Sequence, residues 1–197
     1  MKTVLVATTN ADKLVEIRLI LEGLDLDIVS LASWPDVAAP EETGATFAEN
    51  ARAKALYYCA ATGLPAVAED SGLEIGALDG APGVLSARFG GEAATYPQRF
   101  DLIYRMLAER GASTSPARFV CALALAGEGR VRFETRGAVE GSTAAAPRGD
   151  GGFGYDPIFF YPPFGRTLAE VSRARKASVS HRGQAFRALR DYLRLEA

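Results

Sequence analysis

Cysteine, histidine and tryptophan are scarce in this chain of 197 residues, which has two, one and one of them respectively. Cys59 and Cys121 do not form a Cys-x-x-Cys pair. This usage argues against a disulfide framework or a cysteine zinc site, and it predicts buried thiols in a reducing cytoplasm. The chain also lacks a Gly-x-x-x-x-Gly-Lys-Ser/Thr segment, which excludes a P-loop mechanism.

An excess of one charge is also missing, because 24 acidic residues face 22 basic ones. That balance argues against a protein that holds long nucleic acid by neutralising phosphates, whereas a small anion needs only a few local cations. No apolar run is long enough to cross a membrane, and the short N-terminal one does not fit a signal peptide. We therefore expect neither a nucleic-acid partner nor a membrane partner.

Strand and helix patterns alternate along the whole chain, without repeats or linkers. Short β-branched or aromatic runs predict strands at 4–7, 26–31, 65–75, 118–125, 131–139 and 158–160. Helical periodicity predicts helices at 13–23, 47–62, 96–110 and 180–196, the second opened by a capping box of Thr46 and Glu49. A hairpin at 127–129 favours a mixed sheet, so we expect one α/β domain over residues 1–197.

Polar residues separate the first strand from the first helix, at Thr8, Thr9 and Asn10. A helix N-terminus in this position is a ready anion site. Lys13 lies in the first turn, where the helix dipole disfavours a cation unless an anion faces it. The alternative is that Asn10 only caps the helix and Lys13 is solvated.

The last helix repeats this feature, since it opens with His181 and Arg182, and Lys176 lies five residues earlier. A lone histidine is most often an ordinary surface or core residue. Cations at two helix starts, against the dipole at both, nevertheless favour a polyanionic ligand.

Two adjacent carboxylates, Glu69 and Asp70, open a polar stretch at 69–72 that interrupts the extended pattern of residues 65–75. An unpaired buried carboxylate costs roughly several kcal/mol, and a divalent cation would remove that cost. Glu41 and Glu42 could add oxygen ligands of the kind that Mg²⁺ prefers, and a carboxylate could also act as general base. The alternative is a turn with solvated acids.

Asn50 and Lys54 are four residues apart and so share one helix face, where the lysine either extends to water or reaches into a site. The glycines at 149, 151 and 154 form a formal Gly-x-Gly-x-x-Gly pattern, but they lead into Pro157 and a strand, so this is not a dinucleotide fingerprint. Such a loop could present Phe153, Tyr155 and Asp156 to a base; alternatively its aromatics belong to the core.

These segments, in this order, resemble the inosine triphosphate pyrophosphatase family of enzymes for non-standard purine nucleotides. The matching stretches cover nearly the whole chain, at 7–13, 41–54, 68–73, 80–89, 152–160 and 176–183. The resemblance implies a long, mixed, twisted sheet flanked by helices, with two lobes and a central substrate cleft, in a homodimer. It also implies Mg²⁺-dependent hydrolysis of ITP, dITP or XTP to the monophosphate and pyrophosphate.

The resemblance also implies roles for single residues. Asp70 would be the general base and would hold Mg²⁺ together with Glu41. The residues implied to bind the nucleoside triphosphate are Thr8, Thr9, Asn10, Lys13, Lys54, Ser71, Phe153, Gly154, Tyr155, Asp156, Lys176, His181 and Arg182. Of these, Thr8, Asn10, Lys13 and Lys54 would hold the triphosphate, and Phe153 would stack on the base.

The chain departs from many relatives in having Thr9 in place of glycine and Glu69 in place of aspartate. The longer Glu69 could alter the metal geometry if it is a ligand. Two other functions fit less well: a septum-inhibitor-type pyrophosphatase for modified pyrimidine nucleotides, and a nucleotide sensor without catalysis. The blocks at 153–156 and 176–182 favour the purine family, and the presence of Glu41, Lys54 and Asp70 argues against lost catalysis.

Overall fold

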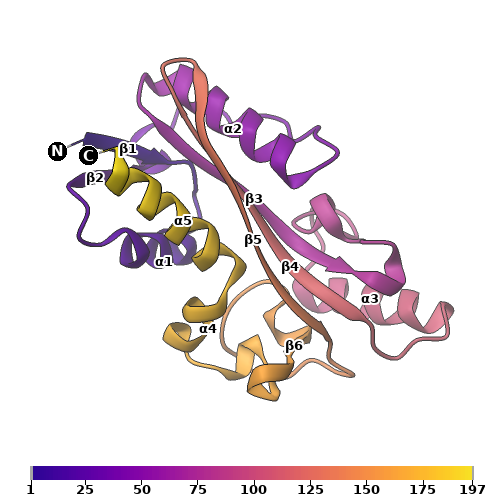
Figure 1. The fold of residues 1–197 in the computed structure, drawn as a ribbon. Helices are drawn as coiled ribbons and strands as arrows, with labels where there is room; N and C mark the ends of the chain where they lie inside the picture. Colours follow the sequence, from indigo (N-terminus) through magenta and orange to yellow (C-terminus); the bar gives the residue numbers. More distant parts are fainter. Residues whose placement is uncertain (1, 197) are drawn as a thin grey trace. The chain divides into compact units, whose positions relative to one another are not determined.

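The computed structural model describes residues 2–196, and within them it has seven strands and five α-helices (Figure 1). The strands are β1 (Lys2–Val6), β2 (Leu26–Ser30), β3 (Ala66–Ile75), β4 (Pro116–Gly127), β5 (Arg130–Thr143), β6 (Phe159–Tyr161) and β7 (Arg166–Thr167). The helices are α1 (Ala11–Leu21), α2 (Phe47–Thr62), α3 (Tyr96–Glu109), α4 (Arg173–Val179) and α5 (His181–Leu195).

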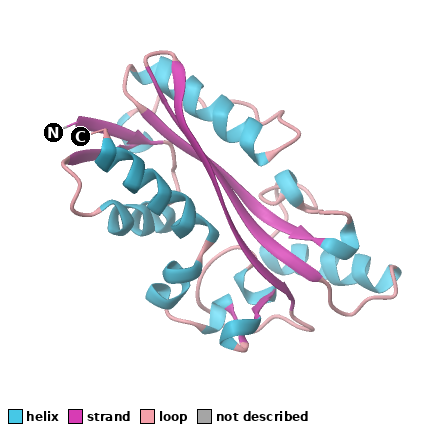
Figure 2. Cartoon of the chain, in the orientation of Figure 1, coloured by secondary structure: helices cyan, strands magenta, loops and turns pink. Residues whose placement is uncertain are grey.

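The strands form one sheet in the order β2-β1-β3-β4-β5-β6-β7. β1 is parallel to β2 and β3, whereas β6 is antiparallel to β5 and β7. β4 and β5 are joined at Glu128 and Gly129, which both have positive φ, as a tight two-residue hairpin requires. The predicted α/β class and mixed sheet are therefore confirmed (Figure 2).

The chain divides into two compact units. Unit 1 contains residues 1–70, 121–137 and 181–197, and unit 2 contains residues 71–120 and 138–180. The long strands β3, β4 and β5 contribute residues to both units.

In unit 1, α1 and α5 lie on one side of the strands and α2 lies on the other (Figure 1). Ile17 of α1 and Phe186 and Leu189 of α5 are fully buried in a core that also contains Val67 of β3. Each such side chain contributes about 1.5–3 kcal/mol through burial. The helical periodicity that predicts the last helix is thus confirmed, and these side chains hold α5 against this core.

The bounds of α2 follow from its local sequence. Its N-terminus has the predicted capping box, in which Thr46 accepts from the backbone of Glu49 and the Glu49 side chain accepts from the backbone of Thr46. Its end is set by Gly63, whose φ of 71° places it in the left-handed region that glycine adopts without strain.

In unit 2, the apolar side of α3 packs against the segments of β3, β4 and β5 that belong to this unit. Phe100, Ile103 and Leu107 of α3 share a buried core with Phe119 and Phe159, whose ring centroids are 4.5 Å apart. This core lies beneath the glycine-rich loop that precedes β6, because Ile158 and Tyr155 belong to the same cluster.

Three elements differ from the sequence-based expectation, one of them the two-residue strand β7, which was not predicted. The acidic residues at 69 and 70 do not interrupt the strand, since β3 continues unbroken from Ala66 to Ile75. Helix α4 was not predicted: three of its seven residues are basic and it has no apolar stripe, and Ser172 caps it by accepting from the backbone of Arg175.

Candidate active site

The segment after β1 forms a local hydrogen-bonded turn. The Thr8 hydroxyl accepts from the Asn10 backbone N–H at 3.1 Å, and the Asn10 side chain accepts from the Lys13 backbone N–H at 3.0 Å. Asn10 therefore caps α1, as the interpretation of this segment as an ordinary helix start predicts. Thr9 is exposed at the tip of this turn.

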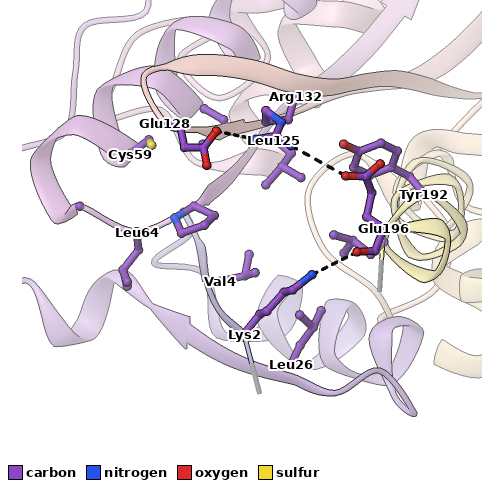
Figure 3. A pocket seen from close by; sticks show the side chains of 15 residues that line it. Lys2, Val4, Leu26, Cys59, Leu64, Leu125, Glu128, Arg132, Tyr192 and Glu196 are labelled. Atoms are coloured by element: carbon purple, nitrogen blue, oxygen red, sulfur yellow. Dashed lines mark hydrogen bonds and ion pairs between the residues drawn. The ribbon is translucent and has the colours of Figure 1, made fainter.

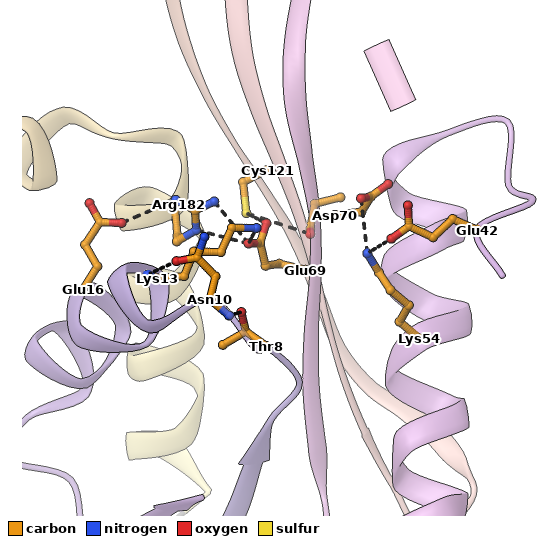
Figure 4. Close-up of polar contacts among 11 residues, drawn as sticks. Thr8, Asn10, Lys13, Glu16, Glu42, Lys54, Glu69, Asp70, Cys121 and Arg182 are labelled. Atoms are coloured by element: carbon orange, nitrogen blue, oxygen red, sulfur yellow. Dashed lines mark hydrogen bonds and ion pairs between the residues drawn. The ribbon is translucent and has the colours of Figure 1, made fainter. Parts of the chain in front are cut away.

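Lys13 is not a solvated surface lysine, because its ammonium lies 2.7 Å from Oε1 of Glu69. The same carboxylate oxygen accepts from Arg182, through Nε at 3.2 Å and Nη2 at 3.1 Å. A second carboxylate, Glu16 of α1, lies 3.4 Å from Nη1 of Arg182. Figure 4 shows these groups converging on one side of β3.

This cluster is strongly desolvated, since Arg182 is only 1% exposed and Glu69 only 9%. Burial would lower the pKa of Arg182, but the negative charges of Glu69 and Glu16 outweigh it and raise that pKa, so the guanidinium stays protonated. Cys121 lies with its Sγ 3.5 Å from Oε2 of Glu69. Burial raises the pKa of Cys121 well above its usual value, which keeps it a thiol and a hydrogen-bond donor.

Asp70 projects from the opposite face of β3, as alternation along a strand requires of adjacent residues. Its Oδ2 accepts from Asn50 at 3.0 Å, and its Oδ1 lies 3.2 Å from the Lys54 ammonium. That ammonium also lies 2.6 Å from Oε1 of Glu42 (Figure 4). The shared helix face of Asn50 and Lys54 is confirmed, and Lys54 reaches inward rather than to water.

The environment of Asp70 suits proton transfer. Burial raises its pKa above the ordinary aspartate value, while Lys54 and Asn50 partly oppose that rise. Burial would lower the pKa of Lys54, but the charges of Asp70 and Glu42 outweigh it and raise that pKa. Lys54 therefore stays cationic, and Asp70 is a carboxylate with an increased affinity for a proton, which is the property of a general base.

Two carboxylates on the α2 side of β3 offer oxygen donors for a metal ion. Glu42 and Asp70 converge on one positive charge, the Lys54 ammonium, so two carboxylates are within reach of a single cation. Among residues 2–196, no three His, Cys, Asp or Glu side chains gather as a metal site. Mg²⁺ binds through one or two carboxylates together with water and phosphate oxygens, and this pair fits that mode. The resemblance implies Glu41, which is exposed, whereas its neighbour Glu42 lies 2.6 Å from the Lys54 ammonium.

In unit 2, the glycine-rich loop surrounds the buried carboxylate of Asp156. Its Oδ2 accepts from the Phe153 backbone N–H at 2.7 Å and from the Lys176 ammonium at 2.5 Å. Lys176 also lies 4.0 Å from the centre of the Phe153 ring, in a cation–π contact. Gly152 has a φ of 70°, and a Cβ there would lie 2.1 Å from Asp156 Oδ2, so the loop needs glycine at this point.

Tyr155 belongs to the core of unit 2. It is buried, its hydroxyl donates to the Ser86 carbonyl oxygen at 2.8 Å, and burial raises its pKa. Its ring meets that of Tyr96 edge to face, with centroids 5.4 Å apart. For Tyr155 the structure therefore favours the core interpretation, while half-buried Phe153 keeps part of its surface accessible.

The predicted residues therefore fall into three groups. Unit 1 holds one group on the α1 and α5 side of β3, formed by Lys13 and Arg182 with the neighbouring Thr8, Asn10 and buried His181. It holds another on the α2 side, formed by Lys54 and Asp70. Unit 2 holds the third, whose members are Phe153, Gly154, Asp156 and Lys176, and it also contains Ser71, a half-buried residue of β3.

Sequence reasoning missed Glu16 and Cys121 as members of the Glu69 cluster. Glu16 lies three residues after Lys13 on α1, so their shared helix face was an available signal. Cys121 lies on β4 and carried no local signal. Both cysteines are free and buried, as expected.

A separate hollow of about 430 Å³ opens elsewhere in unit 1 (Figure 3). Its walls include Val4, Leu26 and Leu125, and at its rim Lys2 donates to the Glu196 carbonyl oxygen at 3.1 Å. Its lining, within the described part of the chain, contains no residue predicted for the site.

No helix within residues 2–196 combines the length and the apolar character needed to cross a membrane.

Comparison with known proteins identifies the family. The model of the Ham1 family matches residues 4–192. A dITP/XTP pyrophosphatase of Geobacter sulfurreducens is 45% identical over 98% of this chain and 97% of its own length, and one of Thermus thermophilus is 48% identical over 96% and 90%. A solved HAM1 protein of Coxiella burnetii superposes with a TM-score of 0.93 at 40% identity and covers 100% of both chains. The chain belongs to the Ham1 family, which confirms the resemblance drawn from its six segments.

Proposed function

We propose that this protein hydrolyses non-standard purine nucleoside triphosphates, namely ITP, dITP and XTP, to the monophosphate and pyrophosphate. The observation that carries the proposal is the 45% and 48% identity, over nearly the full length, to relatives named dITP/XTP pyrophosphatase. The buried Asp70, with an increased affinity for a proton, supports it independently.

The proposal assigns the triphosphate to Lys13, Lys54 and the Thr8–Asn10 turn. The two lysines would offset phosphate charge, which is the main task of a protein in phosphoryl transfer. In the structure each lysine is already bonded to a carboxylate, Lys13 to Glu69 and Lys54 to Asp70. Both ammonium groups are therefore held in place before an anion arrives, and Ser71 follows Asp70 directly on β3.

Asp70 is the proposed general base, and with a carboxylate of the acidic loop it would hold Mg²⁺. The contact geometry supports Glu42 as that second carboxylate, beside the sequence-based assignment of Glu41. A bound Mg²⁺ would neutralise phosphate charge and favour attack by water. Asp70 would take the proton of the attacking water, while Asn50 and Lys54 orient the two carboxylate oxygens of Asp70.

The base is assigned to Phe153, Gly154, Asp156, Lys176, His181 and Arg182. Phe153 would stack on the purine through the ring surface that Lys176 does not cover. A 6-oxo group accepts hydrogen bonds from cationic donors, whereas the 6-amino group of adenine would leave those donors unpaired, at a cost of orders of magnitude in discrimination. We include a homodimer in the proposal, as the family resemblance implies, and a cytoplasmic location, as the cysteine usage predicts.

The first test is Asp70→Asn, with Asp79→Asn as the matched control because Asp79 is an exposed aspartate in a turn. Asp70→Asn should reduce turnover of dITP to background while dITP binding, measured by calorimetry, persists. Asp79→Asn should behave as the wild type. Unchanged turnover in Asp70→Asn would remove the general base from the account.

The same measurements separate the alternatives. A wild-type protein that binds dITP but releases no pyrophosphate would be a sensor. Preference for a methylated pyrimidine triphosphate over dITP would favour the septum-inhibitor-type enzyme, whereas the names of the relatives above favour purines.

A further inference from the structure

Glu69 binds cations from two different helices with one carboxylate oxygen. Its Oε1 lies 2.7 Å from Lys13 Nζ of α1 and accepts from Arg182 of α5 at 3.1 and 3.2 Å. Its Oε2 lies 3.5 Å from the Cys121 thiol of β4. Glu69 thus joins α1, α5 and the sheet at a single buried group.

This arrangement has a physical consequence for Lys13. Its side chain is about one quarter exposed (26%), and a lysine on a flexible stem otherwise samples many rotamers in water. The bond to Glu69 holds the ammonium in one place. Arg182 is anchored more firmly, because it is almost fully buried between Glu69 and Glu16.

The direction of the Glu69 side chain separates it from the proposed metal position. Glu69 faces α1 and α5, whereas Asp70 faces α2, where it meets Lys54 (Figure 4). The Glu69 carboxylate is also already compensated by two positive charges. A carboxylate in this state has no need of a cation from solution.

We propose that Glu69 is a positioning residue, which holds Lys13 and Arg182 ready for the nucleotide and is not a ligand of the metal. This inference rests on the proposed function. It assigns a role to Glu69, where many relatives have aspartate.

The test compares Glu69→Gln, Glu69→Asp and a control, Glu134→Gln. Glu134 also pairs with an arginine, Arg52, but on the surface. Glu69→Gln should raise KM for dITP about tenfold or more, because it removes a charged partner of both cations, and should change kcat less. The Mg²⁺ concentration for half-maximal activity should stay at the wild-type value, and dITP should bind more weakly to metal-free protein by calorimetry.

A double-mutant cycle with Lys13→Ala tests whether Glu69 acts through Lys13. In the Lys13→Ala background, Glu69→Gln should raise KM by less than about threefold, since the group that it positions is gone. If Glu69→Gln raises KM equally in the wild-type and Lys13→Ala backgrounds, Glu69 does not act through Lys13. Glu69→Asp keeps the charge but has a shorter reach, so its KM should lie between those of the wild type and Glu69→Gln. It also provides the test if Glu69→Gln does not fold, because an unchanged KM in Glu69→Asp would then overturn the proposal.

The outcomes separate this inference from the proposed function. If the wild type releases no pyrophosphate from dITP, the proposed function fails. If the wild type is active but Glu69→Gln matches Glu134→Gln, the function stands and the positioning role is wrong. A lower KM in Glu69→Gln would mean that Glu69 competes with the substrate for Lys13, and a tenfold higher Mg²⁺ requirement would make Glu69 a metal ligand; either result overturns the proposal.

Discussion

Replacing Arg182 by methionine tests the energetic importance of the buried ion cluster. Arg182→Met removes the guanidinium from between Glu69 and Glu16 but keeps most of the apolar volume. Glu69 then keeps Lys13, whereas Glu16 loses the cation beside it. Removing one member of a buried ion pair costs about 3–5 kcal/mol, because the remaining charge stays desolvated.

The expected loss is large enough to measure by calorimetry. For a protein of this size each kcal/mol shifts Tm by about 2–4 °C, so Arg182→Met should lower Tm by about 6–20 °C. Arg182→Lys should recover only part of that loss, since a compact ammonium does not reproduce the planar guanidinium, which directs two N–H groups to Glu69 and a third nitrogen to Glu16.

Arg52→Met is the matched control, because Arg52 pairs with Glu134 at 2.8 Å on the surface. Exposed ion pairs contribute little to stability, so its Tm should remain close to that of the wild type. If Arg182→Met lowers Tm no more than Arg52→Met does, the cluster is not a stabilising feature and the argument from burial is wrong.

Two further predictions concern the backbone near α5 and the titration of Asp70. Gly137→Ala would place a Cβ 2.0 Å from the His181 carbonyl oxygen, so the first turn of α5 must shift; we expect a loss of about 1–3 kcal/mol in urea unfolding, and an unchanged midpoint would contradict the close approach. Asn50→Ala removes a hydrogen bond that lowers the pKa of Asp70, so that pKa rises further. Because the base must be deprotonated, the acid limb of the pH profile of kcat/KM should move to higher pH. A limb that stays in place or moves to lower pH would mean that Asp70 is not the group whose titration sets it.

Much of the fold could be predicted because its signals are local. The capping box at Thr46 and Glu49 and the left-handed Gly63 set both ends of α2. The continuity of β3 could not be predicted, because adjacent acids resemble a turn unless their partners are known. Those partners are remote in sequence: Arg182 is 113 residues from Glu69.

The candidate site, like the fold, could be predicted only where its signals are local. Lys13 and Arg182 could be singled out because a cation at a helix start opposes the dipole. That both bind Glu69 is a tertiary fact without a sequence signal. The choice between Glu41 and Glu42 was equally out of reach, since both lie outside the regular elements, in a loop whose side-chain directions follow no period. Helix α4 was missed because a stripe of apolar residues is absent from its basic segment.

The most direct measurement is hydrolysis of dITP, XTP, dGTP, dATP and dTTP with Mg²⁺, with pyrophosphate and orthophosphate assayed separately. The account predicts release of pyrophosphate, selectively from dITP and XTP, and its loss when Mg²⁺ is chelated. Release of orthophosphate, or equal rates on all five nucleotides, would contradict it.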